Sequence, residues 1–263
     1  HDVEHLVGEA DELVVDFLDF ERRRLQHGIA ICADFVGHGA RLSVMSDPTS
    51  DRTPDDTTGK VSSHYFDVDD DDLERLGSSP RTATWSTHGI TVTATSDRGV
   101  FSYGRLDLGT SVLFGLAPAP PLNGTFLDIG CGWGAIALTM ASLSPAAKVY
   151  AVDVNPRALH LVADNAAALH LRNVHALRPD EVHPGITFDL IWSNPPIRIG
   201  KTALHGILDK WLGRLSPDGK AFLVVQKNLG ADSLADWLRR RGFAVERIGS
   251  RKGFRVLRVE RAQ

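Results

Sequence analysis

After about residue 81 the apolar positions of the chain follow two alternating patterns. Apolar runs of strand length recur between segments whose apolar residues return at helical spacing. The strand-like runs are GTFLDI, KVYAVDV, NVHAL, FDLIWS and AFLVVQ, and the helical segments are AIALTMASL, PRALHLVADNAAAL, ALHGILDKWLGRL and LADWLRRRGF. Strands that alternate with helices of this length predict a mostly parallel sheet with right-handed crossovers and helices on both faces.

Two further pairs of strand-like runs complete the pattern. RTATWST and ITVTATS precede the alternating units at 81–96, and AVERIG and FRVLRVE close the chain. The closing pair adds an antiparallel edge to the sheet. The expected fold class is therefore α/β and Rossmann-like, with seven strands in a mostly parallel sheet. In such folds, ligands bind at the carboxyl ends of the strands.

The first 60 residues lack this alternation. Apolar residues between positions 3 and 25 recur at helical spacing, IAICADF and RLSVM flank a short glycine-containing turn, and 46–60 is polar and aperiodic. We therefore expect an N-terminal helical extension, a hairpin and a linker over 1–60. A domain over 61–263 follows, made of the strand pair at 81–96 and a core at 97–263. Residues 67–74, DVDDDDLE, are typical of a solvated acidic turn.

Composition adds few constraints. With 43% hydrophobic residues, the chain can bury a full core. Cys32 and Cys131 cannot build a disulfide framework, and the chain has neither a basic-then-apolar leader nor an apolar run of about 18 residues. A cytoplasmic protein with no membrane partner is the expectation.

Charge is distributed unevenly along the chain. Residues 1–80 carry 7 Lys and Arg against 19 Asp and Glu, whereas residues 198–263 carry 15 against 6. A basic segment on an acidic chain favours a phosphate-binding face, because Lys and Arg displace the counterions of nucleic acid. The cluster consists of Arg198, Lys201, Arg239, Arg240, Arg241, Arg251, Lys252, Arg255 and Arg258.

The segment LDIGCGWGAI, at 127–136, forms the turn after the first strand of the alternating units. Gly130, Gly132 and Gly134 let backbone approach a ligand closely, but they lack the G-x-G-x-x-G spacing of dinucleotide sites. Asp128 would repel a pyrophosphate and attract the ammonium group of an amino acid. Asp153, at the end of the next strand, can accept hydrogen bonds from both ribose hydroxyls. A ribose joined to an amino acid predicts S-adenosylmethionine as the cofactor.

A second motif, SNPPI at 193–197, follows the strand FDLIWS. Consecutive prolines fix an extended backbone without N–H donors, so carbonyl acceptors face outward. Asn194 and the carbonyl of Pro195 can together accept both hydrogens of a planar amino group, which frees the nitrogen lone pair to attack a methyl group. Positioning and electrostatics are sufficient for this transfer, and no strong base is required, because the proton on the nitrogen becomes acidic once the nitrogen is alkylated. The motif therefore indicates N-methyl transfer.

Together these motifs resemble a known family. DIGCGWG, AVDVN and SNPP, with GVFSYGRLDLGTSVLF upstream, make residues 81–260 similar to class I methyltransferases of the methyltransferase-small group. The nearest likeness is to guanine-N2 methyltransferases of 16S ribosomal RNA. SNPP also marks protein-glutamine and DNA-adenine enzymes, so the RNA assignment depends on FS...LD.GT and QKNLGADSL. The resemblance implies ribosomal RNA or an assembling small subunit as the partner.

The resemblance also implies roles for individual residues. Asp180 meets the adenine amino group, and Phe101, Asp107, Gly109 and Thr110 line the methionine end of the cofactor. The full set of implied cofactor-binding residues is Phe101, Asp107, Gly109, Thr110, Asp128, Gly130, Gly132, Gly134, Asp153, Asp180 and Asn194. The implied catalytic residues are Asn194, Pro195, Pro196 and Ile197.

One position departs from the family pattern. The family has Phe or Tyr after the second proline, where the ring stacks on the target base, and this chain has Ile197. Stacking on a base contributes about 1 to 3 kcal/mol in nucleic-acid complexes. Tyr103 and Phe254 are the alternative aromatic residues for this role.

Other functions stay open at this point. The chain could be a protein-glutamine or small-molecule N-methyltransferase, or a non-catalytic RNA-binding scaffold, although the intact Asp128, Asp153 and Asn194 argue against the scaffold. The 11 histidines show no metal-ligand spacing, so no metal is expected. Cys131 is expected to be a small side chain that fits the turn. Trp133 either caps the pocket or packs under the following helix.

Overall fold

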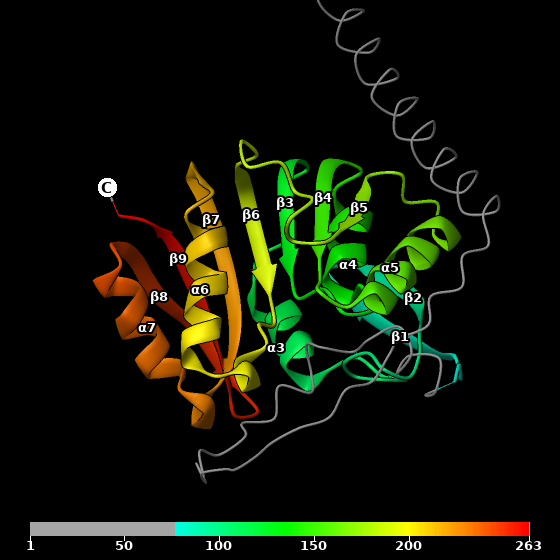
Figure 1. Ribbon diagram of the computed structural model, residues 1–263, viewed down its shortest axis with the longest axis horizontal. Coiled ribbons are helices and arrows are strands. Elements are labelled where there is room, and N and C mark those ends of the chain that lie inside the picture. Colours follow the sequence, from blue (N-terminus) through cyan, green and yellow to red (C-terminus); the bar gives the residue numbers. More distant parts are fainter. Residues whose placement is uncertain (1–76, 263) are drawn as a thin grey trace, which may run out of the picture. The chain divides into compact units, whose positions relative to one another are not determined.

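A seven-stranded sheet forms the centre of the part of the chain that the structure describes (Figure 1). The computed structural model describes residues 77–262. The strand order is β5-β4-β3-β6-β7-β9-β8, in which β9 is antiparallel to both neighbours and the remaining pairs are parallel. The strands are β3 (Asn123–Ile129), β4 (Ala146–Val152), β5 (Val174–Leu177), β6 (Phe188–Ser193), β7 (Leu215–Gln226), β8 (Phe243–Arg251) and β9 (Phe254–Arg261). This arrangement confirms the predicted fold class.

Helices cover both faces of the sheet. One face packs against α3 (Leu108–Leu116), α4 (Ala135–Leu143) and α5 (Pro156–Ala168), and the other against α6 (Lys201–Leu212) and α7 (Ala231–Arg240). The short 3-10 helices η1 (Ile197–Ile199) and η2 (Lys227–Leu229) follow β6 and β7. Pro156 is the first residue of α5. Its fixed φ is compatible with the start of a helix, where its missing N–H group is not needed for a hydrogen bond.

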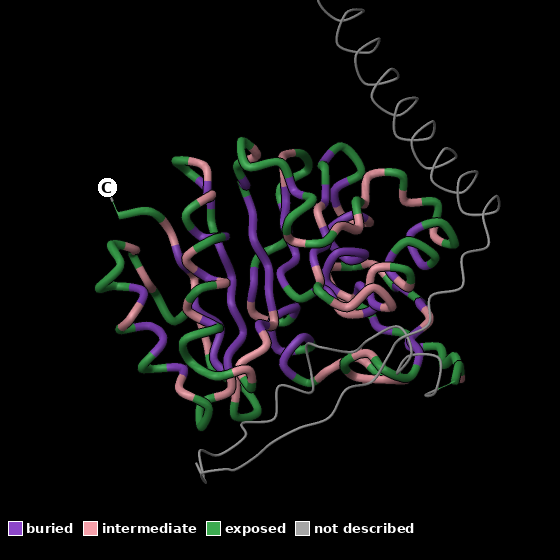
Figure 2. The backbone as a smooth tube through the Cα atoms, in the orientation of Figure 1, coloured by how far each residue is buried: buried purple, intermediate pink, exposed green. Residues whose placement is uncertain are grey.

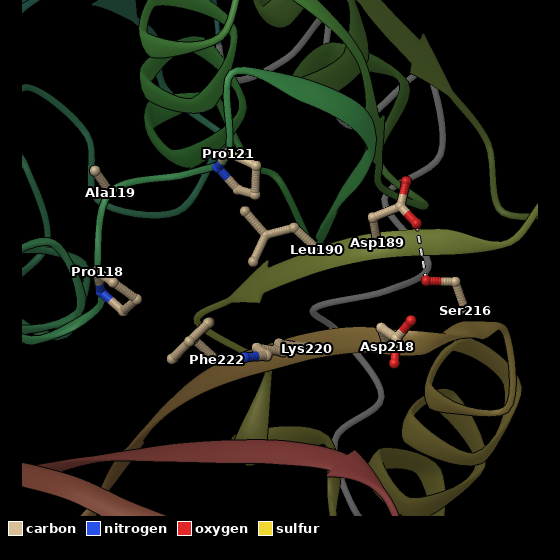
Figure 3. A pocket seen from close by; sticks show the side chains of 9 residues that line it. All are labelled: Pro118, Ala119, Pro121, Asp189, Leu190, Ser216, Asp218, Lys220 and Phe222. Atoms are coloured by element: carbon tan, nitrogen blue, oxygen red, sulfur yellow. Dashed lines mark hydrogen bonds between the residues drawn. The ribbon is translucent and has the colours of Figure 1, made fainter.

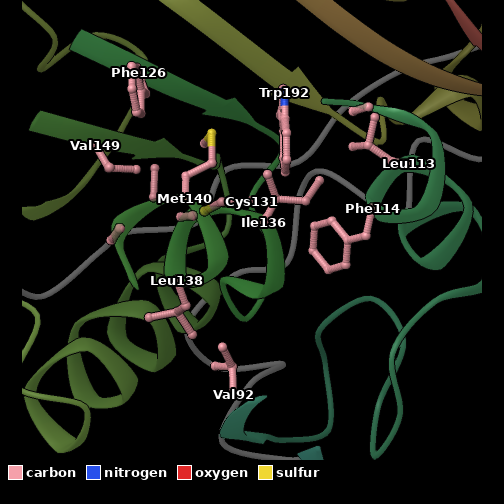
Figure 4. Packing of buried hydrophobic residues seen from close by; sticks show 14 of the residues in the cluster. Val92, Leu113, Phe114, Phe126, Cys131, Ile136, Leu138, Met140, Val149 and Trp192 are labelled. Carbon is pink, nitrogen blue, oxygen red and sulfur yellow. The ribbon is translucent and has the colours of Figure 1, made fainter. Parts of the chain in front are cut away.

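Neighbouring residues of the central strands point to opposite helix layers. Phe126 of β3 lies in the core under α3, α4 and α5, whereas Leu127 lies in the core under α6 and α7. In Figure 2 the central strands are buried along most of their length. Figure 4 shows the first core, where Trp192 of β6, Met140 of α4 and Phe114 of α3 converge. Burial on both faces explains why these strands are nearly continuous apolar runs.

The strand pair before the core forms a separate two-stranded sheet. It consists of β1 (Arg81–Thr87) and β2 (Ile90–Ser96). Trp85 donates a hydrogen bond from Nε1 to Oγ1 of Thr139 in α4 at 3.0 Å, and its ring meets that of Trp133 edge-on at 5.5 Å. The hairpin therefore packs behind the turn between β3 and α4.

Some elements differ from the expectation or lie beyond the described part. The helix α3 is not among those that the apolar pattern predicts, and β7 begins at Leu215 rather than near Ala221, with irregular pairing to β6 at its start. The helix, hairpin and linker expected over 1–60 and the acidic turn at 67–74 lie outside the described residues.

The carboxyl ends of β3, β4, β6 and β7 meet at one edge of the sheet, called here the carboxyl edge. Because β8 runs parallel to β7, the turn between β8 and β9 reaches the same edge, where the N–H of Lys227 donates to the carbonyl of Gly253 at 2.8 Å. A hollow at the opposite edge is lined by Pro118, Pro121 and Asp189 among others (Figure 3). None of the residues of the two motifs lines that hollow, so the candidate site lies at the carboxyl edge.

Candidate active site

The segment between β3 and α4 forms a tight turn at the carboxyl edge. Gly130, Gly132 and Gly134 have φ angles of 69°, 52° and 98°, in the left-handed region that favours glycine. The N–H groups of Gly130 and Cys131 both donate to the carbonyl of Val152, at 2.9 and 3.0 Å, which ties the turn to the end of β4. The turn therefore presents bare backbone to the pocket beside it.

Asp128 lies fully buried near the end of β3, at 0% exposure. Its Oδ2 accepts a hydrogen bond from the N–H of Ala137 at 3.0 Å, and its Oδ1 has no partner among the described residues. Burial raises the pKa of this carboxyl well above its ordinary value, the Ala137 bond opposes the rise, and the charge of Asp153 adds to it. A buried carboxylate oxygen without a partner fits a cationic ligand group such as the ammonium of S-adenosylmethionine, which would favour the ionised form.

Asp153 directly follows β4. Its Oδ2 accepts a hydrogen bond from the N–H of Gly132 at 2.9 Å, and its Oδ1 accepts one from the N–H of Asn155 at 3.0 Å. Burial raises the pKa of this carboxyl, although hydrogen bonds from backbone N–H groups oppose the rise. Each carboxylate oxygen has a further lone pair for a donor, so the arrangement fits the two hydroxyls of a ribose.

The SNPP loop lies beside the glycine turn. The hydroxyl of Ser193, the last residue of β6, donates to the carbonyl of Ile129 at 2.7 Å and so joins the ends of β6 and β3. A Cβ placed on Gly130 would stand 3.5 Å from Cδ of Pro196. The two motifs, which are about 60 residues apart in sequence, therefore form one site, as expected for neighbouring parallel strands.

Asn194 connects this loop to the start of α3. Its Nδ2 donates to Oδ2 of Asp107 at 2.7 Å and to Oγ1 of Thr110 at 3.2 Å. Asp107 also caps α3, because the same Oδ2 accepts a hydrogen bond from the N–H of Thr110 at 3.1 Å. The pocket between the turn, the loop and α3 is lined by Phe101, Ser102, Asp107, Thr110, Gly130, Cys131, Gly132, Trp133, Ala135, Ile136 and Asn194.

Eight residues from the sequence-based set lie outside this pocket lining: Gly109, Asp128, Gly134, Asp153, Asp180, Pro195, Pro196 and Ile197. Gly109 is buried in α3, where a Cβ would stand 2.9 Å from the ring of Phe254, so glycine is needed for packing. Asp180 has an 81% exposed side chain and pairs with Arg178 at 3.7 Å. Ile197 begins η1 and packs on the core under α6 and α7. The expected adenine contact of Asp180 stays a prediction.

The aromatic residues near the site differ in exposure. Phe101 lines the pocket with Asn194 and is 50% exposed. The guanidinium of Arg81 covers the ring of Tyr103 at 4.8 Å from its centroid, and Phe254 packs into the core. Phe101, rather than Tyr103 or Phe254, presents an exposed ring next to the SNPP loop.

Two asparagines that hold the site together were not among the sequence-based candidates. Asn155 donates from Nδ2 to the carbonyl of Gly99 at 2.8 Å, which fastens the Phe101 segment to the end of β4. Asn165 donates from Nδ2 to the carbonyls of Thr95 and Trp133, at 2.8 and 3.0 Å. Trp133 is only 3% exposed and packs against the hairpin behind the turn, although it also borders the pocket. The position of Asn155 directly before Pro156 is typical of a helix cap. No sequence pattern, however, indicates the long-range hydrogen bonds of Asn155 and Asn165.

The basic cluster of the C-terminal segment divides in two. One group is exposed at the carboxyl edge, forms no ion pair with another described residue, and is called here the basic rim: Arg198, Lys201, Arg251 and Lys252. The remaining members do not belong to this rim, because they lie at the other edge of the sheet or form ion pairs. Arg239, Arg240 and Arg241 stand at the far end of α7, while Arg255 is buried against Asp232 and Arg258 pairs with Glu246 and Glu260. The predicted cluster is therefore wrong as a single surface, because α7 runs away from the site.

Within the described residues, no helix is long and apolar enough to cross a membrane. No group of three or more His, Cys, Asp or Glu side chains in that part of the chain could hold a metal ion.

The fold, the glycine turn and the SNPP loop together define an S-adenosylmethionine-dependent methyltransferase. A family model, the methyltransferase small domain, matches residues 91–258. The chain belongs to this family. The resemblance found in the sequence is thereby confirmed.

Individual relatives extend this result. The chain is 32% identical over 204 residues to YbxB of Bacillus subtilis, an uncharacterised protein, with 76% of this chain and all of that protein covered. It is 38% identical over 147 residues to the ribosomal RNA small subunit methyltransferase C of Hahella chejuensis, with 53% of this chain and 41% of the relative covered. The 16S rRNA N2 G1207 methyltransferase of T. thermophilus, solved with AdoMet and guanosine, matches with a TM-score of 0.62 and 26% identity, over 71% of this chain and 52% of that one. The chain thus spans about half or less of these RNA methyltransferases.

Proposed function

We propose that the protein methylates the exocyclic N2 amino group of a guanine in small-subunit ribosomal RNA. The observation that carries the proposal is the position of Asn194, at the carboxyl end of β6 and in one pocket with the glycine turn. When bound, S-adenosylmethionine supplies an electrophilic methyl group on its sulfonium. Asn194 then serves as an acceptor for the amino group that receives this methyl group.

The proposed chemistry requires little from the protein beyond positioning. The side-chain oxygen of Asn194 and the carbonyl of Pro195 accept the two amino hydrogens and draw the nitrogen toward a tetrahedral geometry with a free lone pair. Methylation leaves a positively charged nitrogen, whose surplus proton passes to water without a protein base. Pro196 keeps the loop extended against Gly130.

The choice of RNA as the substrate rests on charge and on the relatives. The four residues of the basic rim lie at the same edge of the sheet as Asn194, where they can contact phosphates on either side of a target nucleotide. The relatives from Hahella chejuensis and T. thermophilus are named as methyltransferases of small-subunit ribosomal RNA. An enzyme with this substrate works in the cytoplasm on assembling subunits, and we propose that a partly assembled subunit is preferred over short naked RNA.

The experiment that tests the substrate class offers the enzyme and methyl-labelled cofactor to three acceptors. These are hypomethylated small subunits, free ribosomal RNA and total cell protein. Label in RNA, with subunits the best acceptor, supports the proposal. Label confined to protein supports a glutamine methyltransferase, and no label in any acceptor with intact cofactor binding supports a non-catalytic scaffold.

A further inference from the structure

The side-chain amide of Asn194 has only one orientation that its surroundings allow. Its Nδ2 lies 2.7 Å from Oδ2 of Asp107, and a carboxylate oxygen can only accept a hydrogen bond. Exchanging Nδ2 and Oδ1 of Asn194 would place two acceptors against each other. Asp107 therefore determines which end of the amide faces the pocket.

Both N–H bonds of this amide are occupied. One hydrogen goes to Asp107, and the other goes to Oγ1 of Thr110 at 3.2 Å. Only the oxygen of Asn194 is left for a ligand, so the side chain of Asn194 offers the pocket an acceptor and no donor. An amino group satisfies such an acceptor, whereas a carbonyl oxygen would leave two lone-pair groups unmatched.

The partners of Asn194 are themselves held rigidly. Asp107 caps α3 through the N–H of Thr110, and Thr110 is 5% exposed. The following turn of α3 is buried in the core, where the ring of Phe114 lies 6.0 Å from that of Trp192 on β6. The capping residue is thus fixed relative to the strand that carries Asn194.

We propose that Asp107 is a positioning residue for methyl transfer. Its carboxylate holds Asn194 with the amide oxygen facing the acceptor nitrogen and thereby makes the site selective for amino groups over carbonyls. This inference rests on the proposed amino-group methylation, and it assigns to Asp107 a role other than the cofactor contact implied by the family resemblance.

Asp107→Ser separates this role from helix capping. Serine is a strong N-cap and can still accept from the N–H of Thr110, but its shorter side chain cannot reach Asn194. We expect kcat at saturating cofactor to fall about 10- to 100-fold, because a misoriented amide no longer places the acceptor nitrogen. If Asp107 only bound the cofactor, the kcat of Asp107→Ser would return to the wild-type value at saturating cofactor. Recovery of wild-type kcat at saturation overturns the proposal.

A reciprocal exchange provides a rescue test. Asn194→Asp alone places two carboxylates against each other and is expected to lose most activity. Asp107→Asn combined with Asn194→Asp restores an N–H donor facing a carboxylate, with an acceptor oxygen left toward the substrate. The double variant is expected to be at least about 10-fold more active than Asn194→Asp. Equal activity of these two variants overturns the proposal.

A readout that does not depend on activity completes the test. The Asn194 side-chain amide signals in a 15N-edited NMR spectrum are assigned by their loss in Asn194→Ala. In the wild type both protons are expected to exchange slowly with water, and in Asp107→Ser at least about 10-fold faster. Unchanged exchange overturns the positioning role. Absence of N2-methylguanine among wild-type products would instead overturn the proposed function, and it would leave the exchange result intact.

Discussion

The carboxylate of Asp153 accepts a hydrogen bond from the N–H of Gly132 across 2.9 Å and so joins the end of β4 to the turn after β3. One side chain therefore shapes the glycine turn, and we propose that its remaining lone pairs accept hydrogen bonds from the ribose hydroxyls of the cofactor. This double use makes Asp153 the most direct test of the cofactor pocket.

We expect Asp153→Ala to weaken S-adenosylmethionine binding by about 1.5 to 3 kcal/mol, as loss of hydrogen bonds to a charged group does. Asp153→Asn keeps the shape but only one acceptor oxygen, so an intermediate loss is expected. Isothermal calorimetry on proteins with wild-type melting behaviour provides the measurement. An unchanged Kd in a folded Asp153→Ala variant would remove this residue from the pocket.

Gly134 is the N-cap residue before α4 and has a φ of 98°, and a Cβ there would stand 3.0 Å from Cγ2 of Val162. Gly134→Ala is therefore expected to destabilise the fold by about 1 to 3 kcal/mol. Gly206→Ala is the matched control, because Gly206 is exposed in α6 and a Cβ there meets nothing within 4 Å. This control should gain about 0.5 to 1 kcal/mol. Urea unfolding measures both changes, and equal effects at the two sites would show that the backbone conformation and packing of Gly134 do not require glycine.

Asp97 and Arg157 form an ion pair at 3.0 Å with side-chain exposures of 9% and 16%. Burial alone would raise the pKa of Asp97, but hydrogen bonds from Ser78, Ser79 and Arg98 and the charge of Arg157 outweigh it and lower the pKa from 3.8 to about 2. This difference corresponds to about 2 kcal/mol of stability.

Because the folded-state pKa of Asp97 is lowered, its stabilisation is present above pH 3.8 and is lost as the pH falls toward 2. Asp97→Asn should be less stable than the wild type by about 2 kcal/mol at neutral pH, and the difference should shrink in acid. Urea unfolding of both proteins across this range tests the pair. A difference that stays constant down to about pH 2 would show that the carboxylate charge does not contribute.

The basic rim predicts RNA binding that weakens with salt. Arg251→Glu combined with Lys252→Glu should lower the affinity for RNA. The slope of log Kd against log salt concentration should also decrease by the contribution of about two phosphate contacts. Arg239→Glu combined with Arg240→Glu is the matched control, since these adjacent arginines lie at the far end of α7. Titrations with labelled RNA at several salt concentrations provide the measurement. Equal losses in the two variants would indicate a non-specific charge effect.

The fold and much of the site follow from local sequence patterns, because buried strands and amphipathic helices leave periodic signals. Gly130 and Asn194 were recognisable for the same reason, since each follows directly from a buried strand. The helix α3 was not predicted, because Gly109 and Gly115 lower its helix propensity and its burial against the sheet stabilises it instead. The bonds of Asn165 join residues that are 32 and 70 positions away, and no local pattern encodes them.

Identification of the methylated nucleoside is the strictest test of whether the protein methylates a guanine amino group that Asn194 positions. Hypomethylated small subunits are treated with labelled cofactor and either the wild type or Asn194→Ala, then digested and analysed by mass spectrometry. We expect N2-methylguanosine with the wild type and at least about 100-fold slower formation with Asn194→Ala, at unchanged cofactor affinity. Label found as N6-methyladenosine or only in protein, or equal rates for the two proteins, would contradict this expectation.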